Sequence, residues 1–293
     1  EQMDHDLDAV VCGVGTGGTL TGHGRFFQKT APHVEMVLAD PQGSVLAPYL
    51  NTGKMIEPGS WLVEGIGEDF IPPNCDLSLA KAAYTIPDAE AFATAREVLR
   101  REGLLVGSSS GTLIAAALRY CREQTSPKRV VTFVCDSGNK YLSKMYNDYW
   151  MLDQGFLARR TYGDLRDLIA RRAEERAIVA VGPDEPLTGA YRRMKLYDLS
   201  QLPVMENDRI MGIIDESDIL MAVYGHEERF NAPVREAMTG RLEVLPPDAP
   251  LDALLPVFHR GRVAIIKDGE AFLGLITRID LLNYLRLKLR DQP

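Results

Sequence analysis

The feature that most constrains the fold is the alternation of short apolar stretches with longer helical ones up to about Trp150. "DAVVCGVG" predicts a buried strand that enters a glycine turn, and "GTLTGHGRFFQKTA" predicts the helix after it. "VEMVLADP", ended by Pro41, predicts a second strand, and "LLVGSSSG" and "RVVTFVCDSG" predict two more. Strands that alternate with helices favour an α/β domain, with a mostly parallel sheet covered by helices on both faces.

Two further helices are expected in the same part of the chain. "DAEAFATAREVLRREG" has helical spacing, with Asp88 as the expected N-cap and Gly103 as the expected end. "TLIAAALRYCREQ" follows the serine-rich turn Val106 to Thr112. Parallel sheets bind ligands at the carboxyl ends of their strands, and the glycine-rich and serine-rich turns both lie at such ends. A ligand site is therefore expected there.

From about Met151 the composition of the chain changes, and a duplication follows. "DRIMGIIDESDILMAV" and "EAFLGLITRIDLLNYL" share an apolar–Gly–apolar order that leads through an Asp into a helix. Gly212 corresponds to Gly274 and Asp218 to Asp280, both 62 residues apart. Repetition at such a period predicts two units that pack together. We expect a first domain over residues 1–150, a linker over 151–162, and repeats over 163–226 and 227–293.

Composition excludes several classes of protein. A hydrophobic content of 45% is ordinary for a globular protein, and the net charge of −8 with no strongly basic block disfavours nucleic acid as a partner. The four cysteines are scattered, so we expect reduced, mostly buried thiols in a cytoplasmic protein. The five histidines are dispersed too, which gives no support to a metal site. No apolar run is long enough to span a membrane, and no signal peptide is recognised.

The first glycine turn leaves three interpretations open. Gly13, Gly15 and Gly18 satisfy the dinucleotide-binding pattern G-x-G-x-x-G, and Asp40 ends the next strand where an acid that binds ribose is expected. Alternatively, the glycines only let the helix approach the strand. In the third interpretation, the two hydroxyls of "GTGGT" and the free amides of a helix N-terminus hold a compact monophosphate.

The motifs "GVGTGGTLTG", "VEGIGEDFIP", "REGLLVGSSSGT" and "CDSGNKYLSKMYNDYWMLDQGF" together resemble the cystathionine β-synthase family. The resemblance implies the C-terminal part of a fold-type II catalytic domain that uses pyridoxal 5'-phosphate, followed by a tandem pair of CBS repeats. It matches the phosphate loop to Gly15, Thr16, Gly17, Gly18 and Thr19. It matches the hydroxyl beside the pyridine nitrogen to Ser109, and a loop beside the substrate to Gly65, Ile66 and Gly67. A neutral hydroxyl favours loss of a β-substituent over transamination.

The resemblance also implies residues that this chain does not contain. The family's Schiff-base lysine precedes the phosphate loop, and only fourteen residues, none of them lysine, precede Gly15 here. We therefore expect no catalytic residue in this chain, and expect the chain to be about two thirds of a longer enzyme. Lys29, Lys81 and Lys140 match no catalytic position. Glu68 departs from the tyrosine of some relatives, which puts details of homocysteine recognition in doubt.

The resemblance further implies that the repeats can bind an adenosyl ligand. Thr277 and Asp280 keep the expected motif in "GLITRID", while Asp215 replaces the hydroxyl and Asp218 is kept in "GIIDESD". A carboxylate at Asp215 would repel a nucleotide phosphate but tolerate the sulfonium of S-adenosylmethionine. Alternatively, the repeats bind no ligand and serve dimerisation or support.

The activity implied is β-replacement that condenses L-serine with L-homocysteine to L-cystathionine, as in transsulfuration and cysteine biosynthesis. Two alternatives remain open. One is a cysteine synthase that acts on O-acetylserine and sulfide. The other is a catalytically incomplete module that senses adenosyl compounds. Amino-acid substrates and a homodimer, or a higher oligomer, are the partners expected from the family.

Overall fold

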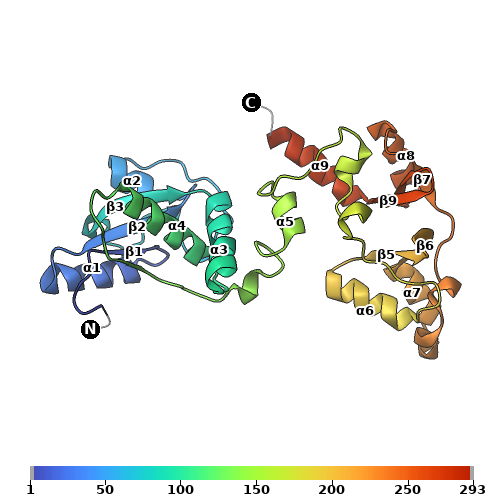
Figure 1. The fold of residues 1–293 in the computed structure, drawn as a ribbon, viewed down its shortest axis with the longest axis horizontal. Helices are drawn as coiled ribbons and strands as arrows, with labels where there is room; N and C mark the ends of the chain where they lie inside the picture. Colours follow the sequence, from blue (N-terminus) through green and yellow to red (C-terminus); the bar gives the residue numbers. More distant parts are fainter. Residues whose placement is uncertain (1–2, 291–293) are drawn as a thin grey trace. The chain divides into compact units, whose positions relative to one another are not determined.

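The structure, a computed structural model, describes residues 3–290 of the chain. Contacts between Cα atoms divide the chain into two units, Glu1–Leu157 and Ala158–Pro293 (Figure 1). Each unit has hydrophobic clusters of its own, so each is described by itself.

The first unit is built on a parallel sheet with the strand order β3-β2-β1-β4. Its strands are β1 (Ala9–Cys12), β2 (Glu35–Pro41), β3 (Ala80–Ile86) and β4 (Val130–Thr132). Its helices are α1 (Gly18–Thr30), α2 (Leu46–Thr52), α3 (Asp88–Glu102), α4 (Ser108–Glu123) and α5 (Asp148–Asp153), with short 3-10 turns at Leu77–Leu79 and Gly138–Tyr141. The predicted α/β class with a parallel sheet is confirmed.

Helices cover both faces of this sheet. Successive side chains of a strand point to opposite faces, so alternate residues of β1 pack against different helices. Ala9 and Val11 of β1 pack in a cluster with residues of α3 and α4. Val10 and Cys12, one residue out of step, pack in a second cluster with residues of α1 and α2. A continuous run of apolar residues in β1 is thus explained by burial on both sides.

Two local expectations in this unit were wrong. Asp88 is the first residue of α3, and Pro87 occupies the cap position. The Asp88 carboxylate instead accepts hydrogen bonds from the backbone amides of Leu62 (2.8 Å) and Val63 (3.3 Å). The stretch "LLVGSSSG" forms no strand, because Val106 pairs with Ser137 in a single isolated β-bridge. Gly103 does end α3, in the left-handed conformation with φ 69°.

The cysteines are free, as expected, but they are not mostly buried. Cys12 and Cys75 are buried, whereas Cys121 and Cys135 are exposed. An amphipathic helix such as α4 exposes one side to solvent, and Cys121 lies near its end on that side.

The second unit contains two small sheets. β5 (Gln201–Glu206) and β6 (Arg209–Asp215) are antiparallel, and β7 (Glu243–Leu245), β8 (Ala264–Asp268) and β9 (Ala271–Ile276) form the other sheet. The helices are α6 (Leu187–Tyr197), α7 (Glu216–Val223), α8 (Leu254–His259) and α9 (Arg278–Arg290). Five 3-10 turns lie at Leu165–Leu168, Ala173–Glu175, Glu227–Asn231, Val234–Glu236 and Leu251–Ala253. No helix among residues 3–290 has the length and apolar character needed to cross a membrane.

Strand register shows that the β5–β6 and β8–β9 hairpins are copies of one another. Gly212 of β6 pairs with Val204, and Gly274 of β9 pairs with Ile266, so both pairs are separated by the repeat period. A register shift follows at the same place in each hairpin. Ile213, from the first copy, shares a hydrophobic cluster with residues of β8 and β9, which packs the copies together.

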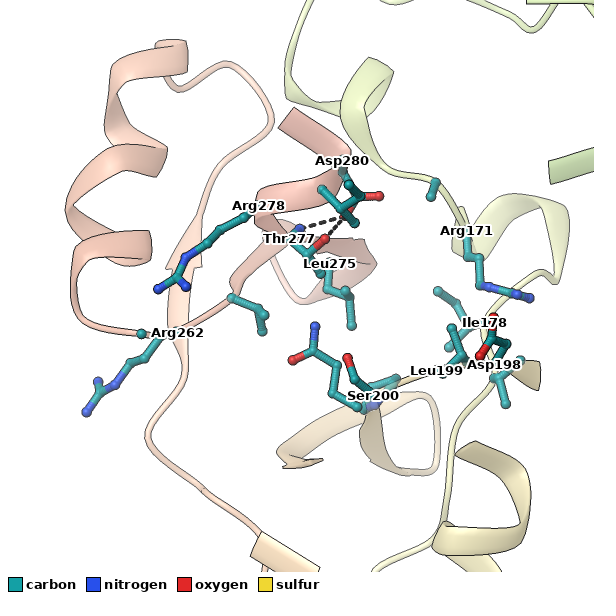
Figure 2. Close-up of a pocket in the computed structure, with 17 residues that line it drawn as sticks. Arg171, Ile178, Asp198, Leu199, Ser200, Arg262, Leu275, Thr277, Arg278 and Asp280 are labelled. Atoms are coloured by element: carbon teal, nitrogen blue, oxygen red, sulfur yellow. Dashed lines mark hydrogen bonds between the residues drawn. The ribbon is translucent and has the colours of Figure 1, made fainter. Parts of the chain in front are cut away.

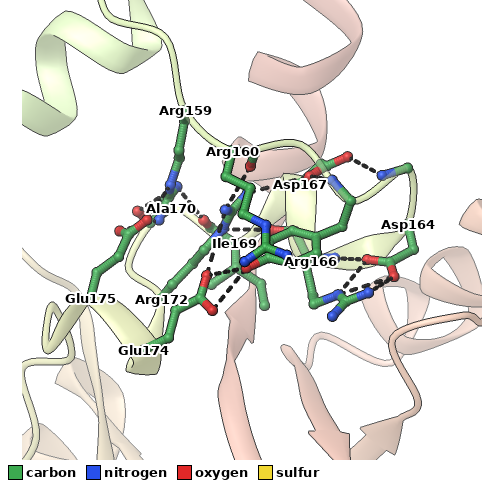
Figure 3. A network of polar contacts seen from close by, with 12 residues as sticks. Arg159, Arg160, Asp164, Arg166, Asp167, Ile169, Ala170, Arg172, Glu174 and Glu175 are labelled. Carbon is green, nitrogen blue, oxygen red and sulfur yellow. Dashed lines mark hydrogen bonds and ion pairs between the residues drawn. The ribbon is translucent and has the colours of Figure 1, made fainter.

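The segment that opens the second unit belongs to the core of the second copy. Leu165, Leu168 and Ile169, which we assigned by sequence to the first repeat, pack with residues of α8, β8 and β9. A polar network holds the same segment (Figure 3). The buried Arg172 guanidinium donates to the carbonyls of Arg160 (2.8 Å) and Arg166 (3.0 Å).

Candidate cofactor and ligand sites

Two glycine loops of the first unit lie against each other at the carboxyl end of β1. The amide of Gly67 donates to the carbonyl of Val14 over 2.8 Å. A Cβ on Gly15 would lie 2.9 Å from the carbonyl oxygen of Gly65. The proposed phosphate loop and the proposed substrate loop, which are 50 residues apart in sequence, are therefore parts of one site.

Gly17 sets the entry into α1. It has φ 86°, which L-residues with a side chain rarely adopt. A Cβ at this position would lie 2.5 Å from Cβ and 2.6 Å from Cα of Cys75. Only glycine fits this combination of conformation and space, and α1 starts at the next residue.

The turn that begins α1 presents free hydrogen-bond donors. Within residues 3–290, the amides of Thr16 through Leu20 donate to no protein acceptor, and the side chains of Thr16 and Thr19 have no partner. Thr16, Gly18 and Thr19 are exposed. Free amides at the N-terminus of a helix, together with two hydroxyls, form a binding site for a compact anion.

The three serines at the start of α4 have different roles. Ser108 Oγ accepts a hydrogen bond from the amide of Glu64 (3.0 Å), and Ser110 Oγ accepts one from the amide of Cys135 (2.9 Å). The Ser109 hydroxyl, in a residue only 5% exposed, has no partner among the described residues. The structure thus leaves one of the three hydroxyls available to a ligand, and it is the one matched to the pyridine nitrogen.

Asp40 does not have the surroundings expected of an acid that binds ribose. Asp40 is fully buried, and its Oδ2 atom accepts a hydrogen bond from the amide of Ala47 at the start of α2 (2.8 Å). Oδ1 has no partner. Burial raises the pKa of Asp40 to about 6. This arrangement favours the monophosphate interpretation of the glycine turn over the dinucleotide one.

Sequence reasoning missed Ser44, which holds the residue after the second glycine loop. The buried Ser44 hydroxyl donates to the carbonyl of Glu68 (3.1 Å) and accepts from its amide (3.0 Å). The amide of Val45 donates to the same carbonyl over 3.0 Å. A serine in a turn after a strand gave no signal that would separate it from any other turn residue.

A cavity of about 460 Å³ lies within the second unit. Figure 2 shows Thr277 and Asp280 on one of its sides, with Ser200, Ile178 and Leu199 across from them. Its wall also includes Ala170 and Arg171 from the opening segment of the unit. The carbonyl of Ala170 accepts a hydrogen bond from the guanidinium of Arg159 (3.1 Å), which also forms an ion pair with Glu175.

The two copies of the proposed adenosyl motif are placed differently. Asp280 Oδ2 accepts hydrogen bonds from both the amide (2.7 Å) and the hydroxyl (2.6 Å) of Thr277, and both residues line the cavity. Asp215 and Asp218 are not among the residues that line it. They form a capping box at the start of α7, in which each carboxylate accepts from the other residue's amide.

Two of the arginines on the cavity wall have their guanidinium groups engaged elsewhere. Arg278 donates to the carbonyl of Phe258 (2.5 Å), and Arg262 donates to Glu243 (2.7 Å). Figure 2 shows both side chains directed away from Thr277 and Asp280. Near Thr277 and Asp280 the cavity therefore offers apolar, hydroxyl and carboxylate groups, while the guanidinium groups of Arg262 and Arg278 hydrogen-bond elsewhere.

Comparisons with known proteins agree with this division. Residues 1–136 match the family described as "Pyridoxal-phosphate dependent enzyme", and residues 166–225 and 234–287 each match "CBS domain". "Cystathionine beta-synthase" from Dictyostelium discoideum is 29% identical over 97% of this chain and 59% of its own length. The protein of that name from Apis mellifera is 30% identical over 97% of this chain and 58% of its own length.

A shorter match covers about half of the chain. "Cysteine synthase A" from Escherichia coli (strain K12) is 38% identical over 49% of this chain and 45% of its own length. The chain thus spans about 59% of the length of the first of these relatives. The first unit thus matches the pyridoxal-phosphate dependent enzyme family, and the second unit matches the CBS domain twice in tandem.

Proposed function

We propose that the protein containing this chain condenses L-serine with L-homocysteine to L-cystathionine, with pyridoxal 5'-phosphate as cofactor. The observation that supports this most directly is the similarity to proteins named cystathionine beta-synthase over 97% of the chain, including the CBS domains. The cysteine synthase match covers only 49% of the chain. A cysteine synthase activity is therefore the second candidate.

The residues of the first unit fit the cofactor. The free amides of Thr16 through Leu20 and the hydroxyls of Thr16 and Thr19 would hold its phosphate. The unpartnered Ser109 hydroxyl would face its ring nitrogen, and Gly65, Ile66 and Gly67 would lie beside the amino-acid substrate. When bound, the cofactor supplies the electron sink for loss of a β-substituent. A hydroxyl carries no full charge, so Ser109 would orient the ring without fixing a proton on the nitrogen.

The deciding experiment gives the full-length, cofactor-loaded protein two substrate pairs, L-serine with L-homocysteine and O-acetylserine with sulfide. A kcat/KM at least tenfold higher with the first pair supports the proposal, and the reverse order refutes it. Ser109→Ala should lower activity with little loss of stability, because no hydrogen bond is removed. The control, Ser110→Ala, should cost about 1 kcal/mol of stability, because it leaves the Cys135 amide unpaired.

Borohydride reduction followed by peptide mass spectrometry would locate the lysine that carries the cofactor. Lys29, Lys81 and Lys140 all have exposed side chains, so we expect the adduct on none of them. No adduct and no turnover, together with tight adenosyl binding, would instead identify a sensing module. The cytoplasmic location suggested by the free cysteines stays a prediction.

We also propose that the cavity of the second unit binds an adenosyl ligand. Asp280, held by Thr277, would accept hydrogen bonds from ribose hydroxyls, while Asp215 and Asp218 would only begin α7. The carboxylate of Asp280, together with the engagement of the Arg262 and Arg278 guanidinium groups elsewhere, favours S-adenosylmethionine over a nucleoside triphosphate. Calorimetric titration of wild type and Asp280→Asn with both ligands tests this. Equal affinity of the two proteins for S-adenosylmethionine would refute the role of Asp280.

A homodimer is the oligomeric state we propose. Leu220 of α7 and Leu282 of α9 occupy corresponding positions in the two copies and are 57% and 60% exposed. Apolar side chains exposed at the same position of both copies favour a surface that another subunit covers.

A further inference from the structure

Glu68 has a carboxylate without a partner at the edge of the proposed active site. Its side chain makes no hydrogen bond or ion pair within residues 3–290. The other glutamate of the same loop, Glu64, forms an ion pair with Lys144 over 2.5 Å. One carboxylate beside the second glycine loop is thus neutralised by the protein, and the other is not.

The backbone of Glu68 is fixed. Ser44 Oγ bonds both its amide and its carbonyl, and the amide of Val45 reaches the same carbonyl. Ser44 is fully buried, so these bonds are shielded from water. The amide of the preceding residue, Gly67, donates to the carbonyl of Val14, which directly precedes the phosphate loop. The main chain therefore holds the base of the Glu68 side chain at the edge of the site.

The carboxylate lies next to the phosphate loop. Oε1 of Glu68 is 4.0 Å from the place that a Cβ on Gly15 would occupy. Partial burial raises the pKa of Glu68, and the negative charge of Asp69 raises it further. A carboxylate whose ionised form is disfavoured by its surroundings gains from a cation brought by a ligand.

The reaction proposed above supplies such a cation. Both reactants are amino acids, and the ammonium group of the incoming thiol is unchanged by the condensation. Sulfide, the nucleophile of the alternative reaction, carries negative charge and no ammonium group. A carboxylate at this place would attract the first nucleophile and repel the second.

We propose that Glu68 determines specificity for the second substrate by pairing with the ammonium group of an amino-acid thiol. The inference rests on the proposed function and adds to it a residue that selects the nucleophile. Glu68 forms no bond with the reacting sulfur, so its effect falls on KM and leaves kcat nearly unchanged.

The test compares L-homocysteine with 4-mercaptobutyrate, which is the same thiol without its amino group. In full-length, cofactor-loaded Glu68→Gln, we expect KM for L-homocysteine to rise about tenfold and KM for 4-mercaptobutyrate to stay within a factor of two. Glu57→Gln, which changes an exposed glutamate upstream of the loop, is the matched control and should alter neither value.

A similar rise in KM for both thiols would mean that the substitution only damages the loop, and the proposal would be wrong. No change for either thiol would also overturn it. Should Glu68→Gln fail to fold, the wild type provides a second measurement. Its preference for L-homocysteine over 4-mercaptobutyrate should fall as salt screens the pairing, and a salt-independent preference contradicts the proposal. A wild type inactive with every amino-acid thiol would refute the proposed function itself, which no result with Glu68→Gln alone does.

Discussion

Gly17→Ala is the substitution whose effect the structure predicts most directly. Gly17 stands between β1 and α1 with φ 86°. The free amides of the proposed phosphate site are its own, that of Thr16 before it, and those of the three residues after it. A methyl group at this position would be strained by the left-handed backbone conformation and would also clash with the backbone of Cys75.

The expected cost has two parts. An alanine in the left-handed region costs about 1–2 kcal/mol relative to its preferred conformation. The new Cβ would lie 2.5 Å from Cβ and 2.9 Å from N of Cys75, so main-chain atoms must move, and overpacking of this kind costs about 1–3 kcal/mol. Together these terms predict a loss of about 2–5 kcal/mol in the free energy of unfolding of the first unit.

Urea denaturation of the full-length protein, followed by tryptophan fluorescence, measures this loss. Gly22→Ala is the matched control. Gly22 lies exposed inside α1 with no atom within 4 Å of its added Cβ, so alanine should stabilise the helix by up to about 1 kcal/mol. Absorbance titration with pyridoxal 5'-phosphate should show affinity lost in Gly17→Ala and kept in Gly22→Ala. A Gly17→Ala protein with wild-type stability and cofactor affinity would refute this reasoning.

Three further predictions concern other parts of the chain. The folded protein binds a proton at Asp40 more tightly than the unfolded chain does, so ionisation of Asp40 removes stability as the pH rises from about 4 to about 6. Asp40→Asn should therefore gain about 3 kcal/mol relative to wild type across that window, measured as unfolding free energy against pH. Arg172→Met should destabilise the second unit by about 3 kcal/mol in thermal unfolding, because it removes two hydrogen bonds and the ion pair with Asp167 that the buried guanidinium makes. Leu220→Glu combined with Leu282→Glu should convert a dimer to monomers in light scattering, and an unchanged mass would exclude this surface.

Sequence patterns predicted the elements whose periodicity is set by burial. The apolar run in β1 is continuous because α3 and α4 cover one face and α1 and α2 the other. The repeat period identified Gly212 and Gly274, whose strands share the same register shift. These features depend on local spacing, which a sequence displays directly.

Features that depend on contacts between distant segments could not be predicted in this way. Asp88 resembles an N-cap, but Leu62 and Val63 supply amides that its carboxylate binds instead. Leu165 and Ile169 lie at the start of the segment assigned by sequence to the first repeat, yet they pack with residues of the second copy that are distant in sequence. The difference among Ser108, Ser109 and Ser110 likewise arises from two loops that approach α4 from elsewhere in the sequence.

The two copies of the CBS motif show why a sequence match does not establish a binding role. Asp215 and Thr277 hold the same position at the start of α7 and α9. In the first copy two carboxylates face each other, and burial together with the charge of Asp215 raises the pKa of Asp218. In the second copy a neutral hydroxyl donates to Asp280, so the helix begins with one charge fewer at a place that lines the cavity. Reciprocal capping satisfies the first pair within the protein, whereas the second pair can bind a ligand without bringing two acids together. For this reason we expect substitution of Asp280 to weaken ligand binding in the cavity, and substitution of Asp215 to leave that binding unchanged.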